Sequence, residues 1–584
     1  MFSFALIHLL ILILTFLSVI SGFKLTLLHT NDMHSWYDPI SVKGRKCKSG
    51  DSKNGLCFGG FGRVASVVKE ARKLDKSGSP VLYLNGGDSF QGTPWFSVYR
   101  GKMVAQMLNM LAPDAMTLGV HEFDDGTDAL AEFLDIINFP LVSCNINLDR
   151  EPKLAKKSML ATSTVITKFK RKIGIVGYIR PDTKDRTQPN NVIYKQEVPA
   201  INKETKKLRD QGVNIIIALG HSGYEKDKDI AKRCPDVDVV VGGQSHTFLY
   251  TGKAPSNDVP EGPYPTIVVK PDGRKVPVVQ AYANTKYLGN LSLEFDNRGN
   301  LLSFKGKPIL LDNRFEPRKD VQNFLDQYRG VIDDMERNVV GTTSVYLNGD
   351  RKSCGLGECN FGNIIADSFV YARVLETISD RNSWTDAPIG LINAGAIRTS
   401  VESGETGAIT EADVVSVLPF SHDMFLTRIS GTQLMKALEH SLQLRSKRIT
   451  GAFLQVSGLR LKFNHSRPNG ERITEIKALC SDCQIPHYEK VETDKYYGVV
   501  LTSFLLNGGE GYSFIDDKRP EVQNLTLLDR NALIRYLQEH KVVYPKREDR
   551  QMVQEKQLDN SGSSLLIEPL LLLSFLYFHR RLFE

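Results

Sequence analysis

The sequence predicts an α/β protein in which a helix joins two domains. The chain has 584 residues, too many for one hydrophobic core, so we expect two domains of a few hundred residues each. Short apolar segments alternate with amphipathic helical segments in both halves, as in layered α/β folds. One amphipathic stretch, from Pro317 to about Asn338, stands alone between the halves and predicts a linker helix.

Apolar runs in the first half predict a series of buried strands. Between the first two, residues 61–74 place Val64, Val68 and Ala71 on one face, which predicts a helix. Polar residues directly follow several of the strands. Because α/β sheets bind their ligands beyond the carboxyl ends of the strands, we expect one shared site there. The predicted strands are residues 24–30, 81–84, 115–118, 141–145, 173–178, 215–219 and 237–241.

The second half, from Gly341 to about Pro545, predicts another α/β unit. Its strand at 389–392 leads into Asn393 and Arg398, and the aromatic residues Phe420 and Phe504 lie further along. The expected division of the chain is a signal peptide at 1–22, a first domain at 23–316, a linker at 317–340, a second domain at 341–548, and a polar spacer with an apolar tail at 549–584.

Composition and charge describe an ordinary soluble globular protein, with 41% hydrophobic and 24% charged residues. The net charge of +7 is modest for this length. It suits an anionic small ligand or an anionic cell surface, and it does not favour nucleic acid as a partner.

Both ends of the chain carry apolar segments that resemble targeting signals. Residues 1–22 contain an apolar run that ends in Ser21-Gly22, as in secretory signals. Near the other end, small residues at 560–564 precede an apolar stretch at 565–578, which is shorter than the about 20 residues that a membrane-spanning helix needs. This pattern resembles a lipid-anchor signal, and the alternative is an apolar tail on a secreted protein. We therefore expect a secreted protein or one on the extracellular face of the plasma membrane.

Six of the eight cysteines form close pairs, which predicts three local disulfides in an oxidising compartment. A zinc site at Cys480 and Cys483 is the alternative for one pair, but no second CxxC or histidine pair stands near it. Cys144 and Cys234 lie beside apolar strands and are predicted to be buried thiols. Glycosylation sequons occur at Asn290, Asn464 and Asn524. The predicted bridges are Cys47–Cys57, Cys354–Cys359 and Cys480–Cys483.

Aspartate and histidine residues at the ends of the predicted strands indicate metal chemistry. Such mixed donors suit zinc, manganese or a similar divalent ion. A carboxylate that bridges two ions about 3.5–4 Å apart would form a hydrolytic centre that activates water against a phosphoryl group. The segment Gly119–Asp124, sequence GVHEFD, is typical of a strand end that delivers catalytic groups to the same site. The candidate ligands are Asp32, His34, Asp88, His221 and His246.

Short motifs occur along the chain in the order NDMH, GGDSFQG, GVHEFD, LGHSG and GGQSHTF, and then ECNFGN, NAGAIR, VLPF and SFLLNGGEG. In sequence and in order, they resemble the motifs of the ecto-5′-nucleotidase and apyrase family. The resemblance covers about residues 24–548. It implies a four-layer αββα metallophosphoesterase domain, a linker helix and a smaller α/β nucleotide-binding domain. It also implies removal of phosphate from extracellular nucleotides, with nucleotides or nucleosides as ligands and, in some relatives, a lipid anchor.

The resemblance also implies roles for individual residues. Asp88 would bridge two metals, with Asp32, His34 and His246 on the first, and His221 and the residues at 120 and 244 on the second. His121 would stabilise charge that develops at the phosphoryl group or leaving oxygen, oriented by Asp124. The implied substrate residues are Asn393, Arg398, the aromatic pair Phe420 and Phe504 that would clamp the base, and Glu510.

Four positions depart from the family pattern. Val120 stands where an asparagine ligand belongs and Gln244 where a histidine belongs, and both changes affect the second metal. Valine has no donor atom, and glutamine oxygen is a harder ligand than imidazole. In the second domain Gly355 replaces an arginine that holds substrate in relatives, and Glu510 replaces a ribose-binding aspartate. We expect one firm metal site, one weakened site and an altered nucleotide pocket.

Two functions follow from these observations. The first is an extracellular phosphohydrolase that releases phosphate from AMP, ADP or ATP with zinc, manganese, calcium or magnesium, at reduced activity. The second is a catalytically inactive relative that binds nucleotides or a host protein, for example to inhibit platelets. The retained ligands favour the first, and the paired changes at Val120 and Gln244 favour the second. Nucleotide preference and the formation of a homodimer stay open.

Overall fold

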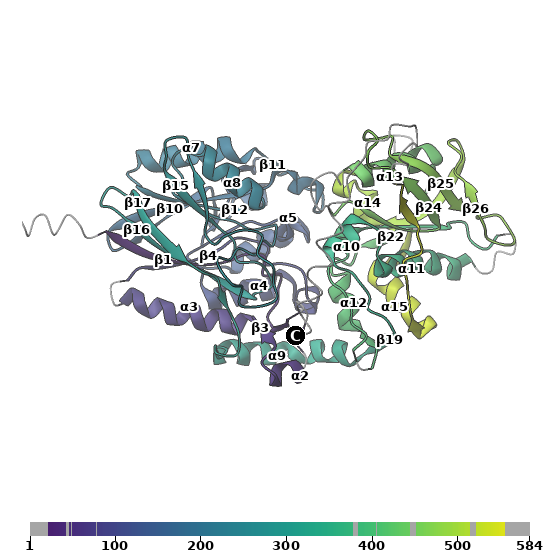
Figure 1. Ribbon diagram of the computed structural model, residues 1–584, viewed down its shortest axis with the longest axis horizontal. Helices are drawn as coiled ribbons and strands as arrows, with labels where there is room; N and C mark the ends of the chain where they lie inside the picture. Colours follow the sequence, from purple (N-terminus) through teal and green to yellow (C-terminus); the bar gives the residue numbers. More distant parts are fainter. Residues whose placement is uncertain are drawn as a thin grey trace, which may run out of the picture.

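The computed structural model describes residues 22–42, 46–47, 49–76, 79–377, 383–404, 406–443, 451–513 and 521–554. The predicted signal peptide, apart from Gly22, and the predicted anchor segment lie outside the described residues. Two lobes lie side by side, and helix α9 (Lys319–Arg337) runs along one edge of the pair (Figure 1). Among the described residues, no helix is both long and apolar enough to cross a membrane.

Two stacked sheets form the N-terminal lobe. The first has the strand order β17-β16-β1-β4-β5-β6-β8, with β18 paired to β16, and the second has the order β14-β15-β13-β12-β10-β9. The first sheet contains β1 (Phe23–Thr30), β4 (Val81–Asn85), β5 (Ala115–Thr117), β6 (Leu141–Val142), β8 (Leu160–Ala161), β16 (Tyr287–Phe295), β17 (Leu301–Gly306) and β18 (Ile309–Leu310). The second contains β9 (Ser163–Lys168), β10 (Arg171–Ile179), β12 (Ile215–His221), β13 (Val239–Val241), β14 (Thr266–Val269) and β15 (Lys275–Val279).

Helices cover the outer face of each sheet. α3 and α4 pack on the first sheet, and α7 and α8 pack on the second. Between the sheets, Leu27 and Leu84 meet Ile175 and Leu219 in a separate apolar core. The predicted helix–sheet–sheet–helix order is therefore confirmed. The helices are α2 (Ser49–Lys53), α3 (Phe61–Lys76), α4 (Pro94–Leu111), η1 (His121–Phe123), α5 (Gly126–Ile136), α6 (Pro152–Ala155), η2 (Pro181–Asp185), α7 (Glu197–Asp210) and α8 (Tyr224–Arg233).

The strands of the N-terminal lobe follow the apolar runs, with ends that move by one to three residues, and two of these differences are instructive. The strand predicted at 141–145 ends at Val142, because the amide of Cys144 turns to donate to the carbonyl oxygen of Gly177 in the other sheet, at 2.8 Å. The strand predicted at 215–219 continues to His221, since β12 pairs with β10 up to that residue. The second difference matters for the site because it places His221 on the sheet itself.

The C-terminal lobe is built on a sheet of order β23-β20-β27-β22-β28. Helices α11 and α15 cover one face, and α13 covers the other. The strands of this sheet are β20 (Ile389–Asn393), β22 (Asp423–Ser430), β23 (Leu454–Ser457), β27 (Tyr496–Thr502) and β28 (Val522–Leu528). The helices are α10 (Arg351–Leu356), α11 (Asn360–Thr377), η3 (Ala394–Ala396), α12 (Glu411–Val417), α13 (Gly431–Gln443), α14 (Ser503–Leu506), η5 (Gly509–Gly511) and α15 (Asp529–His540).

Smaller sheets complete the two lobes. Strands β26-β25-β24-β30 and β21-β19-β29 belong to the C-terminal lobe, and β2 with β3 and β7 with β11 belong to the N-terminal lobe. Their bounds are β2 (Ile40–Ser41), β3 (Cys57–Phe58), β7 (Ile146–Asn147), β11 (Ile193–Tyr194), β19 (Val339–Thr343), β21 (Ala408–Thr410), β24 (Leu459–Phe463), β25 (Ile473–Leu479), β26 (Tyr488–Lys490), β29 (Val542–Val543) and β30 (Gln551–Val553).

Helix α9 is fixed to the N-terminal lobe on its apolar face. Val321, Leu325 and Ile332 are buried in the core that also holds α3 and α4. Arg329 forms an ion pair with Asp38 at 2.8 Å. A helix therefore occupies the region predicted as the linker, while the domain bounds at 23–316 and 341–548 stay predictions.

All three predicted disulfides are present: Cys47–Cys57, Cys354–Cys359 and Cys480–Cys483. Cys480 and Cys483 are thus bonded to each other, although the Nδ1 atom of His487 approaches the Cys480 sulfur at 3.4 Å. Of the two cysteines predicted as buried thiols, Cys234 is buried and Cys144 is half-buried.

Candidate functional site

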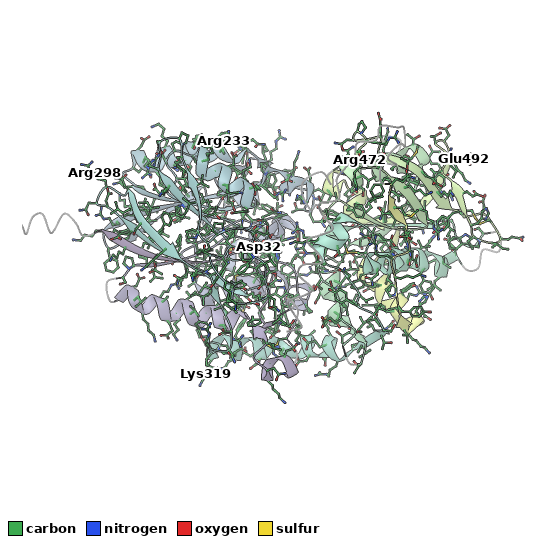
Figure 2. The ribbon with its side chains drawn as sticks, viewed as in Figure 1. Asp32, Arg233, Arg298, Lys319, Arg472 and Glu492 are labelled. Atoms are coloured by element: carbon green, nitrogen blue, oxygen red, sulfur yellow. A yellow bond between two sulfur atoms is a disulfide. The ribbon has the colours of Figure 1, made fainter. Side chains whose placement is uncertain are left out.

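The candidate site forms where several strands end, on the side of the N-terminal lobe that faces the C-terminal lobe (Figure 2). Two loops there support each other, because the amides of Asp32 and His34 donate to the carbonyl oxygens of Gly87 and Asp88, both at 3.0 Å. Asp32, His34 and Asp88 have φ angles of 50°, 49° and 53°. Non-glycine residues seldom adopt this left-handed conformation, and such strain is concentrated at functional sites.

The five predicted metal ligands converge in this region. Asp32, His34 and His246 have donor atoms within 4.8 Å of one another, and so do Asp32, Asp88 and His221. His246 Nε2 lies 3.3 Å from Asp32 Oδ1, and His221 Nε2 lies 2.8 Å from Asp88 Oδ2. Two adjacent groups of three donors therefore share Asp32.

Buried polar atoms in these groups suit a bound cation. Within the described part of the chain, Asp32 Oδ1 and His221 Nε2 are buried and make no hydrogen bond of good geometry, although His246 Nε2 lies 3.3 Å from the first and Asp88 Oδ2 lies 2.8 Å from the second. Buried polar atoms are otherwise nearly always paired, and a divalent ion would satisfy both. Burial raises the pKa of Asp88, but the neighbouring His221 and His121 outweigh it and hold the pKa well below its ordinary value. An ionised carboxylate beside imidazoles is a donor set suited to zinc or manganese.

Glu122, to which the sequence analysis assigned no role, holds the loops of the site in place. Its carboxylate is fully buried and accepts hydrogen bonds from the amides of Asp88, Ser89 and Gly119 at 3.1, 2.7 and 2.6 Å. Burial raises its pKa to about 7. Its place inside the GVHEFD motif was the available signal, but only the fold shows that it connects the β4 loop to the β5 loop.

His121 and Asp124 form the predicted pair on η1. His121 Nδ1 lies 2.6 Å from Asp124 Oδ2, and the spacing of three residues on one helical turn brings them together. Because a carboxylate can only accept, Nδ1 carries the proton and Nε2 is left for other contacts. Burial lowers the pKa of His121, but the Asp124 and Asp88 carboxylates outweigh it and raise the pKa.

The two departures from the metal pattern lie in the same cavity. Val120 is 5% exposed and presents only methyl groups. Gln244 has φ 78°, and its backbone amide donates to Asp32 Oδ2 at 2.9 Å. The weakening of the second metal site stays a prediction.

The C-terminal lobe closes the cavity. The five predicted substrate residues, from Asn393 to Glu510, all line the cavity that Asp88, His121 and His246 line from the other side. Arg398 Nη2 is 3.5 Å from His121 Nε2, and the rings of His121 and Phe420 stack with centroids 5.7 Å apart. The residues are Asn393, Arg398, Phe420, Phe504 and Glu510.

His422 is a pocket residue that the sequence analysis missed. Its ring stacks on Phe420 at 5.5 Å and on Phe504 at 5.4 Å between centroids, so it contacts both members of the predicted aromatic clamp. Its Nδ1 lies 3.8 Å from the buried Asp529. Burial lowers the pKa of His422 to about 4 and raises that of Asp529 to about 7. A position two residues after the VLPF motif carries no signal by itself.

Glu510 contacts the other lobe. Its carboxylate pairs with Arg186, which follows η2 of the N-terminal lobe, at 2.9 Å. Gly355, where an arginine was expected, is buried in α10 and does not line the cavity, whereas Arg351 of the same helix does. Neither Arg186 nor Arg351 was predicted, because both depend on contacts between distant segments.

Comparisons with known proteins agree with this geometry. Residues 25–248 match the family model of calcineurin-like phosphoesterases, and residues 339–517 match that of the 5′-nucleotidase C-terminal domain. The chain is 41% identical to 5′-nucleotidase of Bos taurus over 530 residues, which covers 90% of both chains. It is 40% identical to snake venom 5′-nucleotidase of Gloydius brevicauda over 503 residues, 85% of this chain and 84% of that one. Among solved structures, the 5′-nucleotidase precursor of Thermus thermophilus superposes on this chain with a TM-score of 0.81 at 33% sequence identity. The superposition covers 91% of this chain and 100% of the Thermus chain. The chain therefore belongs to the 5′-nucleotidase family of metal-dependent phosphohydrolases.

Proposed function

We propose that the protein is an extracellular nucleotidase that releases phosphate from AMP, ADP or ATP. One observation carries this proposal: the Asp/His groups and the His121–Asp124 pair of one lobe share a single cavity with Arg398 and the aromatic residues of the other lobe. A phosphate at the metal groups and a base at the aromatic rings would then be held by opposite lobes.

The side chains around the cavity have complementary tasks in this proposal. A divalent ion held by Asp32, His34, Asp88, His221 and His246 would supply Lewis acidity and an activated water. Asp124 fixes the imidazole of His121 so that Nε2, beside Arg398, faces the oxygen on which charge develops. Phe420 and Phe504, with Asn393, would orient the nucleoside, and contact between the lobes would exclude bulk water.

Location outside the cell is part of the same proposal. The apolar segments at both ends, the disulfides and the sequons support it, and a venom 5′-nucleotidase is among the relatives. Attachment by a lipid anchor is the finer form of the proposal. Mass spectrometry of the C-terminal peptide from membrane and medium fractions distinguishes an anchored form from a secreted one.

A nucleotide-binding or host-protein-binding relative without catalysis is the second candidate, favoured by Val120 and Gln244. Phosphate release from AMP, ADP and ATP with added zinc, manganese, calcium or magnesium separates the two. We expect slow release that disappears with EDTA and in the Asp88→Ala variant. No release with any ion, from protein that still binds a nucleotide, would favour the second candidate.

A further inference from the structure

The loop that carries Gln244 and His246 has a strained backbone. It follows β13, and both residues have left-handed φ angles, 78° for Gln244 and 52° for His246. Such a conformation is unfavourable for residues other than glycine and persists only where neighbouring contacts hold it. Two contacts at the metal groups depend on it. The amide of Gln244 donates to Asp32 Oδ2 at 2.9 Å, and His246 Nε2 lies 3.3 Å from Asp32 Oδ1.

Gln280, which directly follows β15, supplies the contacts that hold this loop, from a fully buried position. Its Oε1 atom accepts from the hydroxyl of Ser245 and the amide of Thr247, both at 3.1 Å. Its Nε2 atom donates to the carbonyl oxygen of Gly243, also at 3.1 Å. Residues 243, 245 and 247 stand before, between and after the two strained residues. One side chain therefore fixes the loop on both sides of each strained residue.

A buried carboxylate holds Gln280 in turn. Gln280 Nε2 donates to Asp227 Oδ2 at 2.7 Å, and the hydroxyl of Tyr178 donates to Asp227 Oδ1 at 2.7 Å. Asp227 and Tyr178 pack under the ends of two strands of the same sheet. A Cβ atom at Gly220 of β12 would overlap the Tyr178 ring, and one at Gly242, after β13, would overlap the Asp227 carboxylate. Because only glycine allows so close an approach, the strand ends and this pair fit each other closely.

We propose that Gln280 is a positioning residue for the metal site. Held by Asp227, it keeps the loop in the strained form that directs His246 toward Asp32 and fixes the orientation of the Asp32 carboxylate. Gln280 does not line the cavity, so it acts through the loop and not on a ligand. Hydrogen bonds behind metal ligands typically contribute about 10- to 100-fold to metal affinity.

The zinc affinity of the purified full-length protein tests this role. Zinc is titrated against a chelating dye with the wild type and with Gln280→Met, which keeps the length of the side chain but removes its hydrogen bonds. We expect the zinc Kd of Gln280→Met to rise by about 10- to 100-fold. Since the titration needs no substrate, its outcome does not depend on whether the protein hydrolyses AMP, ADP or ATP.

Two variants of Asp227 separate hydrogen bonding from charge. Asp227→Asn keeps an acceptor for Gln280 and can donate to the oxygen of Tyr178, so it should retain the zinc affinity of the wild type. Asp227→Leu removes both contacts and should resemble Gln280→Met. A loss in Asp227→Asn as large as that in Asp227→Leu would contradict the proposed relay, because charge and not the contact with Gln280 would then matter.

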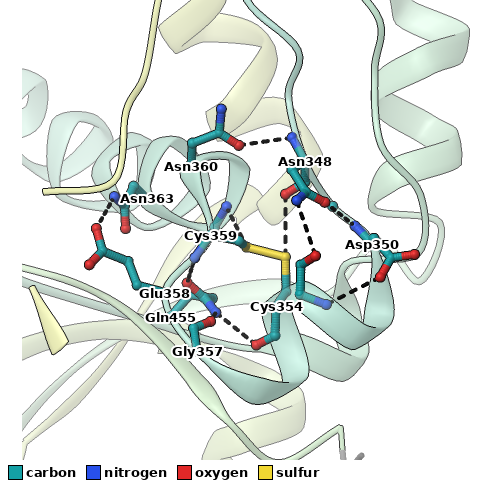
Figure 3. Close-up of a disulfide and its surroundings, with 12 residues drawn as sticks. Asn348, Asp350, Cys354, Gly357, Glu358, Cys359, Asn360, Asn363 and Gln455 are labelled. Atoms are coloured by element: carbon teal, nitrogen blue, oxygen red, sulfur yellow. Dashed lines mark hydrogen bonds between the residues drawn. A yellow bond between two sulfur atoms is a disulfide. The ribbon is translucent and has the colours of Figure 1, made fainter. Parts of the chain in front are cut away.

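Gln455 of the C-terminal lobe is the matched control. It is also fully buried, and it donates to the carbonyl oxygens of Cys354 and Gly357 at 2.8 and 2.7 Å (Figure 3). Its Oε1 atom accepts from the amide of Cys359 at 3.1 Å. Gln455→Met should lower the thermal midpoint about as much as Gln280→Met does, and it should leave zinc affinity unchanged.

Zinc affinity that falls equally in Gln280→Met and Gln455→Met would reflect lost stability alone and would overturn the proposal. Unchanged affinity in Gln280→Met would overturn it too. If Gln280→Met does not fold, Ser245→Ala takes its place, because it removes one loop contact at a half-buried position. We expect Ser245→Ala to weaken zinc binding by a smaller factor, and wild-type affinity in that variant would also contradict the proposal.

Discussion

The two halves of the cavity differ in how they tolerate a lost side chain. On the N-terminal side, donor atoms are fixed by short loops that bond to each other and to Glu122. The side chain of Val120 presents no donor atom to the cavity, and its neighbour His121 is held to Asp124 through Nδ1. On the C-terminal side, Arg351 lines the cavity one helical turn from Gly355, the position where the family resemblance predicts an arginine.

This difference follows from the chemistry of the two ligands. Metal–ligand bonds hold only within about 0.2 Å of an ideal distance, so a donor cannot move along the chain. A phosphate can be bound by a long, flexible side chain from several backbone positions, since charge and a planar fork matter more than the point of attachment. We therefore expect substitutions on the metal side to cause larger effects than those on the substrate side.

The largest expected effect is that of His121→Ala. It removes the group next to the reacting oxygen and the contact with Arg398, so we expect kcat to fall by roughly a thousandfold, in the range of general acid–base and charge-stabilising groups. His540→Ala on the exposed end of α15 is the control and should have wild-type kcat. Steady-state phosphate release measures both, and a loss of less than tenfold for His121→Ala would remove it from the mechanism.

Glu122→Ala tests the rigidity of the metal side. It leaves the amides of Asp88, Ser89 and Gly119 without their acceptor in a buried place, so we expect the free energy of unfolding to drop by roughly 3 kcal/mol. Urea denaturation followed by circular dichroism measures it. Glu132→Ala, at an exposed position on α5, should be neutral. If both variants unfold at the same urea concentration, the loops do not depend on Glu122.

The sequence predicts the metal side of the cavity better than the substrate side. Asp32, His34 and Asp88 could be identified because each closely follows an apolar strand, and parallel strands place their carboxyl ends together. His422, Arg186 and Arg351 could not, because they reach the cavity through contacts between segments far apart in the chain. The distance between Arg186 and Glu510, for example, depends on how the lobes meet, and no local pattern encodes it.

Restoring the family ligands on the metal side should increase activity. In the double variant Val120→Asn/Gln244→His, two donors return to positions that line the cavity, so we expect kcat/KM for AMP to rise by about 10- to 100-fold. The same variant should hold more than one zinc ion per chain when measured by atomic emission after dialysis. Unchanged activity with a higher metal content would mean that the second ion is not limiting.

Gly355→Arg should have the smallest effect, and it completes the comparison. If Arg351 already supplies the phosphate contact, a second guanidinium four residues away on the same face adds repulsion rather than binding, so kcat/KM should not increase. The thermal midpoint of the variant must be measured beside its kinetics, because position 355 is buried. In the Arg351→Ala background the same substitution meets an empty position, and there kcat/KM should recover by several fold. A tenfold gain in the wild-type background would show that the substrate side lacks its arginine just as the metal side lacks its donors, and the distinction between the two halves would then be lost.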